Sequence, residues 1–402
     1  MGSCSRSRLP FVIGSHSGAF PKNRNLSVNV VHSCTVNPFN YQGPVGPAHL
    51  IDRRSELDDL QQAAADRVAV RLAAPRRFGK SSLLDAHIFA MREAGHRAVR
   101  VDFSKVATLG DVAARVAGSF RDLPNDPGRS VRRWAARLEV GASVAGVGVS
   151  VAARPPRPPA DEARAALLEL LDVPQALHQA DGGLTVVCFD EFQDVLIADD
   201  ALDGLMRSVI QHHGEAAAYV FAGSQPSLMH ALFAEHERPF YGQARPLELP
   251  ALPIAEAAHD IEALLVADGL DPGRAVDELL AYTGGHPQRT ILLAHHLYNL
   301  LEQQPDHSDP APAALELALA ETQDAHQALW DGLNRNERLV LLAVGDGQAP
   351  TGSVVASEHR VARSTLQEAL ERLLADERHV KRDAGGKPHL LDPLLAEWLK
   401  RR

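Results

Sequence analysis

The sequence predicts an α/β protein with a three-layer αβα core around a parallel sheet, followed by a helical lid and a winged helix-turn-helix domain. Residues 67–95 pass from a short β-branched apolar run, through a turn with Pro and Gly, into an amphipathic helix. That order is typical of a strand, loop and helix in a parallel α/β unit. Residues 184–189 form a second apolar run, which fits a strand buried on both faces. Residues 333–391 contain helical stretches and then two short strands around Gly385 and Gly386, the pattern of a winged helix.

The bulk composition indicates an ordinary globular protein. The chain has 402 residues, of which 45% are hydrophobic and 23% charged, enough for two or three domains. Its net charge of −10 argues against an overall electrostatic attraction to nucleic acid, which leaves only local patches. Cys4, Cys34 and Cys188 show no metal-ligand spacing and fit a reducing compartment. Because no apolar run reaches the roughly 20 residues that span a bilayer, we expect a cytoplasmic protein.

Changes in composition divide the chain into four expected regions. Residues 1–35 are expected to be an unstructured extension, or sequence upstream of a misassigned start. Residues 36–253 would form the core, with a glycine-rich β-hairpin inserted near residues 139–152. Residues 254–304 are predicted to be the helical lid, and residues 313–402 a helical linker and the winged-helix domain.

The turn between the first strand and its helix has the residues of a phosphate-binding loop. Gly79 lets successive backbone N–H groups point inward, and the helix that begins near Lys80 adds its free N–H groups and the positive end of its dipole. Lys80 is placed to neutralise the β- and γ-phosphates, and the Ser81 hydroxyl to ligate Mg²⁺. The loop departs from the pattern G-x-x-x-x-G-K-[ST] at Ala74, where a left-handed conformation would cost roughly 1–2 kcal/mol and a need for smallness alone would cost little. The predicted nucleotide-binding residues of this segment are Ala74, Pro75, Arg76, Arg77, Phe78, Gly79, Lys80, Ser81 and Ser82.

Two carboxylates follow the second predicted strand. In an open parallel sheet, ligands bind beyond the C-terminal ends of the strands, so Asp190 is expected to hold Mg²⁺ together with Ser81. Glu191 is expected to orient or deprotonate the attacking water. A third strand at residues 218–224 ends in Ser224, which is expected to lie between the acidic strand and the γ-phosphate. The candidate catalytic residues are therefore Glu191, Asp190 and Ser224.

Other basic residues are weaker candidates for contacts to the transition state or to DNA. Arg238 or Arg245, the second of which precedes a predicted short strand at residues 247–252, would stabilise transition-state charge in this chain or a neighbour, or would be surface arginines. In the winged-helix region acidic and basic residues nearly balance. This balance favours a protein-interaction or regulatory role, with Arg360, Arg363 and Ser364 as the residues that would contact DNA phosphates.

With these pieces in order, the chain resembles the archaeal-type ATPases of the AAA+/STAND group of P-loop NTPases. The resemblance covers residues 36–402, and its motifs are residues 51–57, 74–84, 189–193, 222–224, 284–287 and 392–393. It implies an adenine pocket that includes Arg53, with His286 and Pro287 closing over the nucleotide, and switching between ADP- and ATP-bound states. Besides Ala74, the chain departs from the family pattern at Asp52, where glycine is usual, and at Gln243, where an arginine often stands. The loss of a trans-acting arginine would slow hydrolysis by about 10³–10⁵-fold.

The sequence therefore predicts an ATP-binding protein that hydrolyses ATP slowly with Mg²⁺ and acts as a nucleotide-controlled molecular switch. The alternative is a nucleotide-binding regulator of DNA or protein with negligible hydrolysis. A kinase on the same scaffold is a more distant alternative, because the sequence shows no site for a molecule that would accept the phosphoryl group. The expected partners are ATP and ADP, a protein or a second copy of the chain through the ATPase core, and DNA through the winged helix. No membrane partner is expected.

Overall fold

The computed structural model describes residues 36–43, 46, 50–121, 123, 159–375, 379–383 and 385–402. The predicted extension at residues 1–35 and the predicted hairpin at residues 139–152 lie outside the described residues. Residues 37–402 form one compact unit. In the described part of the chain, no helix has the length and apolar character needed to cross a bilayer.

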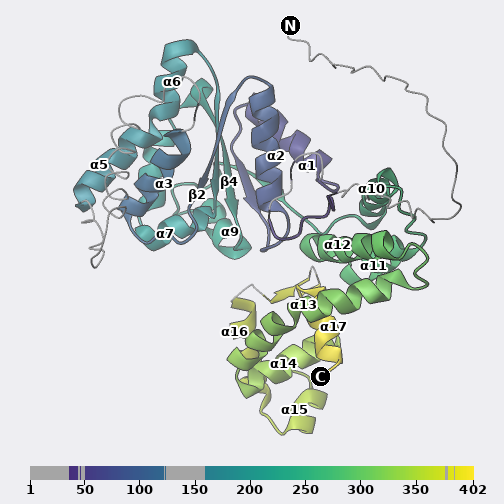
Figure 1. Cartoon of the computed structure of the whole chain (residues 1–402). Helices are drawn as coiled ribbons and strands as arrows, with labels where there is room; N and C mark the ends of the chain where they lie inside the picture. Colours follow the sequence, from purple (N-terminus) through teal and green to yellow (C-terminus); the bar gives the residue numbers. More distant parts are fainter. Residues whose placement is uncertain are drawn as a thin grey trace, which may run out of the picture. The chain divides into compact units, whose positions relative to one another are not determined.

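Five strands form the central sheet in the order β2-β3-β4-β1-β5, and every neighbouring pair is parallel. Figure 1 shows this sheet, with β2 and β4 labelled, between helices such as α2 and α3. They are β1 (Val70–Ala73), β2 (Arg97–Asp102), β3 (Thr185–Asp190), β4 (Ala217–Gly223) and β5 (Arg245–Glu248). Because the strands are parallel, the loops that follow them leave the sheet at the same edge. The prediction of an α/β core with a parallel sheet is confirmed.

The bounds predicted for the last strand were wrong. Strand β5 begins at Arg245 and pairs with β1 only as far as Glu248, not over residues 247–252. Beyond it, the Leu252 amide donates a hydrogen bond to the Gly285 carbonyl at 2.8 Å. The chain leaves the sheet there because its backbone groups bond to the turn between two lid helices.

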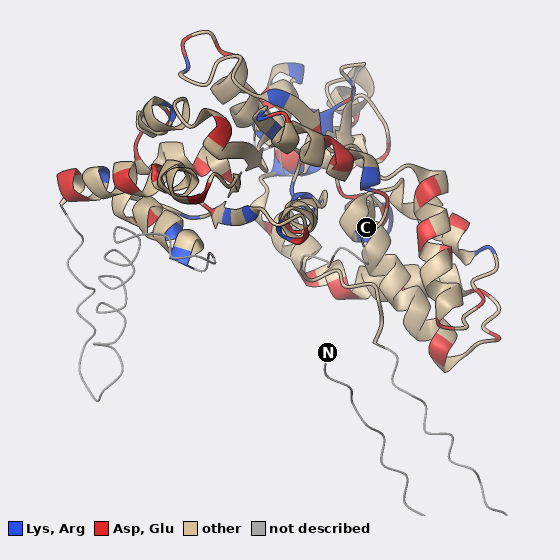
Figure 2. Ribbon diagram, turned by 90° about the horizontal axis from the view of Figure 1, so that it is seen from above, with Lys and Arg blue, Asp and Glu red and all other residues tan. Residues whose placement is uncertain are grey.

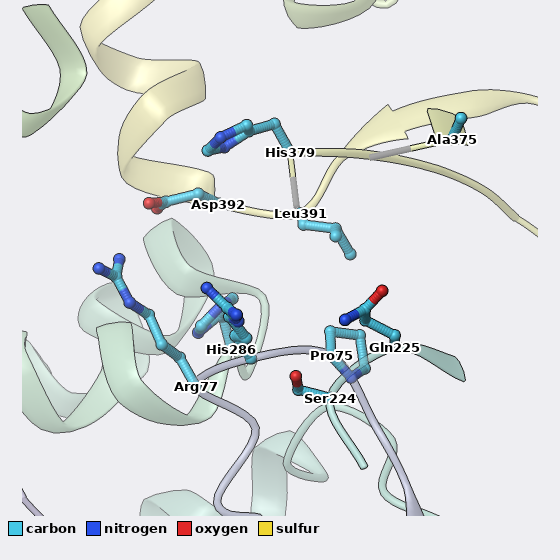
Figure 3. A pocket seen from close by; sticks show the side chains of 10 residues that line it. Pro75, Arg77, Ser224, Gln225, His286, Ala375, His379, Leu391 and Asp392 are labelled. Carbon is cyan, nitrogen blue, oxygen red and sulfur yellow. The ribbon is translucent and has the colours of Figure 1, made fainter. Parts of the chain in front are cut away.

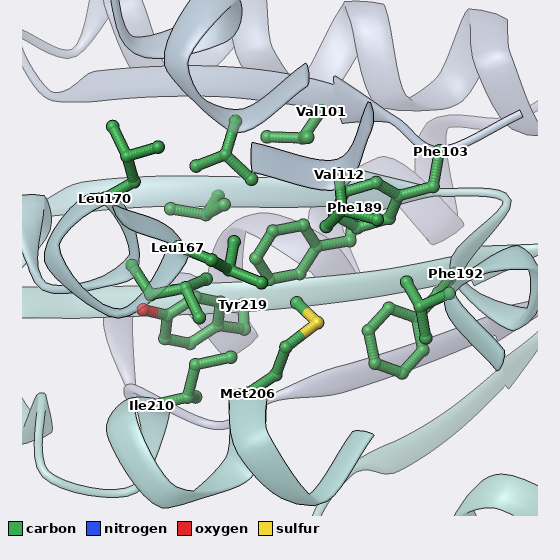
Figure 4. Close-up of a cluster of buried hydrophobic side chains, with 14 of the residues drawn as sticks. Val101, Phe103, Val112, Leu167, Leu170, Phe189, Phe192, Met206, Ile210 and Tyr219 are labelled. Atoms are coloured by element: carbon green, nitrogen blue, oxygen red, sulfur yellow. The ribbon is translucent and has the colours of Figure 1, made fainter. Parts of the chain in front are cut away.

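Alternating side chains of the strands face two different cores, which makes the three layers. Val187 and Phe189 pack among large side chains from the helices of one face (Figure 4), whereas Val186 and Cys188 pack against the other face. The first face is covered by α3 (Leu109–Arg121), α5 (Ala160–Leu171), α6 (Val173–Asp181), α7 (Val195–Ala198), α8 (Leu202–Ile210) and α9 (Pro226–Ala234), with the short 3₁₀ helix η2 (Phe192–Asp194). The second face is covered by α1 (Arg54–Ala65) and α2 (Lys80–Glu93).

The predicted lid region contains helices that share a core of their own. These are α10 (Ile254–Ala267), α11 (Ala275–Thr283) and α12 (Pro287–Gln303). The longer α13 (Pro310–Gly332), which lies beyond the predicted lid, packs into the same core. Phe39 and Ile51, which precede the sheet in the chain, are buried in the same core. Gly285, between α11 and α12, has φ of +75°, and a Cβ on it would lie 2.2 Å from the Leu252 carbonyl oxygen. Only glycine fits that position, because any side chain would collide with the backbone.

The C-terminal region is a winged helix, as predicted. It consists of α14 (Arg335–Gly345), α15 (Ser353–His359), α16 (Arg363–Ala375), the antiparallel hairpin of β6 (Val380–Arg382) with β7 (Pro388–Leu390), and α17 (Pro393–Lys400). Helix α14 starts with a capping box, in which the Asn334 side chain accepts from the Glu337 amide and Glu337 accepts from the Asn334 amide. The hairpin therefore packs beside a helical core, which is the arrangement that defines a wing.

Candidate functional site

The predicted phosphate-binding loop connects β1 to the first turn of α2. Gly79 precedes α2 with φ of +87°, and nothing lies within 4 Å of the place where its Cβ would be. Glycine is therefore favoured there by backbone conformation, not by lack of space. Arg77 also has a positive φ, +69°, in the same loop. The loop backbone thus has the curled form that turns N–H groups toward an anion.

Ala74 lies in the loop without backbone strain. It is not among the residues with positive φ, it is almost fully buried, and its amide donates to the Gly223 carbonyl at 3.3 Å. The left-handed conformation that would penalise alanine does not occur at this position. A small side chain meets the requirement of this position, so the departure from the glycine pattern has little conformational cost.

Lys80 is buried under the loop. Its Nζ donates hydrogen bonds to the carbonyl oxygens of Ala74 and Pro75, at 2.9 and 3.2 Å. Burial lowers the pKa of Lys80, and the nearby carboxylates of Glu191 and Asp190 oppose that shift. The ammonium group is therefore fixed at the loop, with acidic side chains opposite it.

The two predicted Mg²⁺ ligands lie together. The Ser81 Oγ is 3.4 Å from Asp190 Oδ2, at the end of strand β3. The same Oδ2 accepts a hydrogen bond from Arg100 at 2.7 Å, a contact that sequence reasoning missed. Burial raises the pKa of Asp190, whereas the Arg100 charge lowers it. The described residues contain no group of three or more His, Cys, Asp or Glu side chains that could hold a metal by itself, and Mg²⁺ in nucleotide sites is commonly bound by few protein ligands together with phosphate oxygens. Hydroxyl and carboxylate oxygens fit that role.

Glu191 and Ser224, which come from adjacent strands, are also brought together. Glu191 has φ of +50°, and its Oε2 accepts hydrogen bonds from the Ser224 hydroxyl at 2.6 Å and from the Ser224 amide at 3.2 Å. A third donor is the Gln193 side-chain amide, at 2.7 Å. Gln193 was not predicted as a site residue, although it belongs to the quoted motif at residues 189–193. Its position as a polar side chain two residues after the glutamate was the available signal.

The lid contacts the loop through residues around the α11–α12 turn. His286 accepts a hydrogen bond from the Arg289 amide at the start of α12, and its ring packs edge-on against Phe78 with centroids 5.0 Å apart. Burial lowers the pKa of His286 to about 4, so the imidazole is neutral at neutral pH. The Gln288 amide donates to the Arg77 carbonyl at 3.3 Å. Backbone and aromatic contacts therefore tie the lid to the phosphate-binding loop.

These elements surround a cavity of about 550 Å³, which we call the main cavity. Apolar side chains of Ile51, Leu252 and Ile291 line it along with the loop. Arg53 lines it too, and its guanidinium donates to Glu56 at 2.8 Å and to the Pro250 carbonyl at 2.7 Å. The predicted site residues that line the main cavity are Arg53, Arg76, Arg77, Gly79, Lys80, Ser81, Ser82, Glu191 and Pro287.

A smaller cavity of about 260 Å³ shares Arg76 and Arg77 with the main one. Its lining includes the predicted residues Pro75, Ser224 and His286 on the core and lid side. Figure 3 shows Leu391 and Asp392 of the winged helix on the opposite side. Ala74, Phe78 and Asp190 line neither cavity. The predicted residues thus group around two cavities that share Arg76 and Arg77, and not all of them face the main cavity.

The three positions considered for an arginine at the transition state lie elsewhere in this chain. Arg238 is 3.5 Å from the buried carboxylate of Asp203, and Arg245 donates to the Asp59 carbonyl at 2.9 Å. Gln243 accepts from Arg207 at 2.7 Å. None of the three lines the main cavity as the described residues define it. Within one chain, neither Arg238 nor Arg245 serves this site.

The sheet order, the loop at the end of β1, the acidic end of β3, the helices that follow and the winged helix together make a P-loop fold that is similar to solved structures of Walker-type ATPases. The Walker-type ATPase of Pyrococcus abyssi matches 90% of this chain and 99% of its own length at 16% identity, with a TM-score of 0.64. The Orc2 protein of Aeropyrum pernix, solved in ADPNP–ADP complexes, matches 91% of this chain and 96% of its own length at 15% identity, with a TM-score of 0.56. Neither a protein-family model nor a curated protein sequence matches the chain. At these identities the likeness establishes the fold.

Proposed function

We propose that this protein binds ATP with Mg²⁺, hydrolyses it slowly, and acts as a nucleotide-controlled molecular switch. The observation that carries the proposal is the grouping of Lys80, Ser81 and Glu191 on the wall of one cavity, with Asp190 directly behind Ser81. Backbone amides of the loop and the Lys80 ammonium would bind the phosphates. The Orc2 protein that shares the fold was solved with ADPNP and ADP, which supports an adenine nucleotide as the ligand. The apolar end of the cavity at Ile51 and Ile291 suits the adenine ring.

The chemistry is assigned to the carboxylates and to Ser224. Glu191 would orient the attacking water and accept its proton. Ser224, which bonds to Glu191 through both its hydroxyl and its amide, would hold that carboxylate in place. When bound, Mg²⁺ would neutralise charge that develops on the phosphate oxygens, and Ser81 and Asp190 are the residues that would hold it.

Two features support a slow switch. Glu191 Oε2 already accepts three hydrogen bonds from the protein, so this carboxylate has only its other oxygen, Oε1, left to take a proton from water. The loop is also joined to the lid through Gln288 and His286, and the lid to the winged helix through the ion pair of Arg289 with Asp392. A change at the phosphates would therefore reach the C-terminal domain along direct contacts.

Binding can be tested through stability. Mg-ATP at 100 times its Kd is expected to raise the free energy of unfolding of the wild type by about 2.7 kcal/mol, as measured by urea unfolding. Lys80→Ala is expected to lose most of this gain, because its ammonium would no longer neutralise the phosphates. Lys381→Ala, which removes an exposed lysine of the wing, serves as the control and should keep the gain. A wild-type protein that Mg-ATP does not stabilise would refute the proposal as a whole.

For the winged helix we propose a protein partner in preference to DNA, and for the ATPase core we propose contact with a protein or with a second copy of the chain. Acidic and basic residues are interspersed along the described ribbon (Figure 2). Arg363 donates to the Thr351 carbonyl at 3.0 Å, and Arg382 donates to Glu371 at 3.1 Å. Cations already bonded within the domain contribute less to binding phosphates.

The DNA alternative predicts a distinct salt response. We expect a gel shift with duplex DNA to give weak binding that changes little with salt. Each phosphate that the protein neutralises would contribute about −0.9 to the slope of log K against log salt. A steep slope that decreases in Arg360→Ala or Arg363→Ala would establish DNA binding through the winged helix and contradict the preference for a protein.

A further inference from the structure

The phosphate-binding loop carries two arginines, Arg76 and Arg77, whose guanidinium groups form no hydrogen bond or ion pair with the described residues. Arg76 and Arg77 are both exposed, and both line the main cavity. Most arginines near the site are paired: Arg53 with Glu56, Arg100 with Asp190, and Arg289 with Asp392. Two free cations beside a phosphate-binding loop are available for an anionic ligand.

The surroundings of the two arginines differ. The charge of Arg76 adds to the effect of burial in lowering the pKa of Lys80, and it also lowers the pKa of Asp194 against the effect of burial. Lys80 and Asp194 both line the main cavity, as Arg76 does. For Arg77, partial burial and the charge of Arg289 lower the pKa, whereas Asp392 opposes that shift. Figure 3 shows the Arg77 side chain directed toward Asp392.

Arg76 is therefore better placed than Arg77 to reach the γ-phosphate. The cavity that Arg76 lines also holds Lys80, whose ammonium would bind the same phosphate, and Glu191. A guanidinium offers a planar pair of donors that matches two phosphate oxygens at once. Arg238 and Arg245, by comparison, are bonded to other parts of the chain.

We propose that Arg76 is the cation that stabilises the transition state of ATP hydrolysis, and that it acts on the site of its own chain. This inference rests on the proposed hydrolysis. In that reaction the water oxygen forms a bond to the γ-phosphorus, and the bond from that phosphorus to the β–γ bridging oxygen breaks with its electron pair going to ADP. Glu191 receives a proton of the water, and the products are ADP and inorganic phosphate. Arg76 would neutralise the negative charge spread over the γ-phosphate oxygens during the transfer.

A cation supplied within the chain has a kinetic consequence. The site would not depend on a neighbouring subunit for its transition-state charge, so turnover per chain is expected to be independent of protein concentration. An arginine in cis is associated with slow turnover, on the order of 10⁻² s⁻¹ in a GTPase that uses one. A switch that hydrolyses ATP slowly, with all its catalytic residues in one chain, is consistent with a turnover rate of that order.

The first test separates catalysis from binding. Arg76→Ala is expected to lower kcat by about 10³–10⁵-fold, with a much smaller change in the Kd for ATP measured by fluorescent-nucleotide titration. Arg164→Ala, which removes an exposed arginine of α5 far along the chain from the loop, is the control and should keep the wild-type kcat. Arg76→Lys should recover only part of the loss, since an ammonium lacks the paired donors.

The second test asks whether Arg76 acts on the site of its own chain or on the site of a neighbouring chain. In a mixture of Arg76→Ala with Lys80→Ala, an arginine that acted in trans would restore hydrolysis. The Lys80→Ala chain would then supply its Arg76 to the site of the Arg76→Ala chain, which keeps Lys80. We expect no restoration. Recovery on mixing would overturn the assignment to the same chain, and an equal loss in Arg77→Ala with full activity in Arg76→Ala would overturn the assignment to Arg76. Either result leaves the proposed function in place, whereas a wild type that binds ATP without turnover refutes both the hydrolysis and this inference.

Discussion

Glu191→Gln is expected to bind Mg-ATP as the wild type does and to hydrolyse it about 10²–10⁴-fold more slowly. The glutamine oxygen can still accept hydrogen bonds from the Ser224 hydroxyl and amide and from Gln193, which now bond to Glu191 Oε2. The geometry of the strand ends should therefore persist. What the substitution removes is the carboxylate that would accept a proton from the attacking water.

The measurement is single-turnover hydrolysis of radiolabelled ATP, with binding measured separately by the stabilisation of the protein against urea. Glu215→Gln is a matched control, because the Glu215 side chain is 82% exposed and does not line the main cavity. It should keep the wild-type rate. If the wild type and Glu191→Gln hydrolyse ATP equally slowly while both bind it, the protein is a nucleotide-binding regulator with negligible turnover, and the enzyme proposal fails.

Arg289→Met is expected to destabilise the fold by about 3–5 kcal/mol, the usual cost of removing one partner of a buried ion pair. Arg289 of α12 is almost fully buried, and its guanidinium bonds to both carboxylate oxygens of Asp392. Asp392 also accepts from the Leu394 amide at 3.0 Å, which caps α17, and lies 3.5 Å from His326. The substitution would leave a buried carboxylate with little compensation where the lid meets the winged helix.

Urea unfolding at neutral pH checks this expectation. The control is Arg401→Met, since Arg401 pairs with Glu316 at 2.7 Å with both side chains largely exposed. Exposed pairs contribute at most about 1 kcal/mol. The double variant Arg289→Met with Asp392→Asn should regain part of the lost stability, because the amide keeps a hydrogen-bond acceptor for the cap while the unpaired charge is gone. A loss in Arg289→Met no larger than that in Arg401→Met would contradict the prediction.

The pH dependence of the same pair has a definite sign. Burial alone would raise the pKa of Asp392, but hydrogen bonds from His326 and Arg289, together with the Arg289 charge, hold it well below its ordinary value. A carboxyl with a lowered folded-state pKa adds stability above its unfolded pKa of about 3.9, and this contribution is lost as the pH falls through the folded value. The difference in stability between the wild type and Asp392→Asn should therefore shrink below about pH 4.

Much of the fold could be predicted because its signals are local in the sequence. The run before the loop, Gly79 at its end and the apolar residues of β3 have spacings that each need only a few neighbouring residues to interpret. The helices and wing of the C-terminal domain follow from the same kind of pattern. Local spacing also placed Lys80 and Ser81 in one loop and Asp190 and Glu191 at one strand end.

Tertiary structure alone decided which side chains meet. Ser224 bonds to Glu191 across 33 residues of sequence, Arg100 to Asp190 across 90, and Arg289 to Asp392 across 103. These contacts depend on the order of the strands and on how the lid docks, which no local pattern specifies. The same holds for Arg238 and Arg245, whose partners Asp203 and Asp59 come from other elements.

The phosphate-binding loop shows which features the sequence determines and which only the tertiary structure decides. The sequence alone determined that a strand, a loop with Gly79-Lys80-Ser81 and a helix follow one another, because conformational preference and helix geometry are properties of short segments. Only the folded chain decided that Ala74 is unstrained beside Gly223, that Lys80 is held by loop carbonyls, and that the charge of Arg76 reaches Lys80 and Asp194. The physical reason is that burial, hydrogen bonding and electrostatic interaction depend on distances in space, and these are set when the strands, lid and loop pack together.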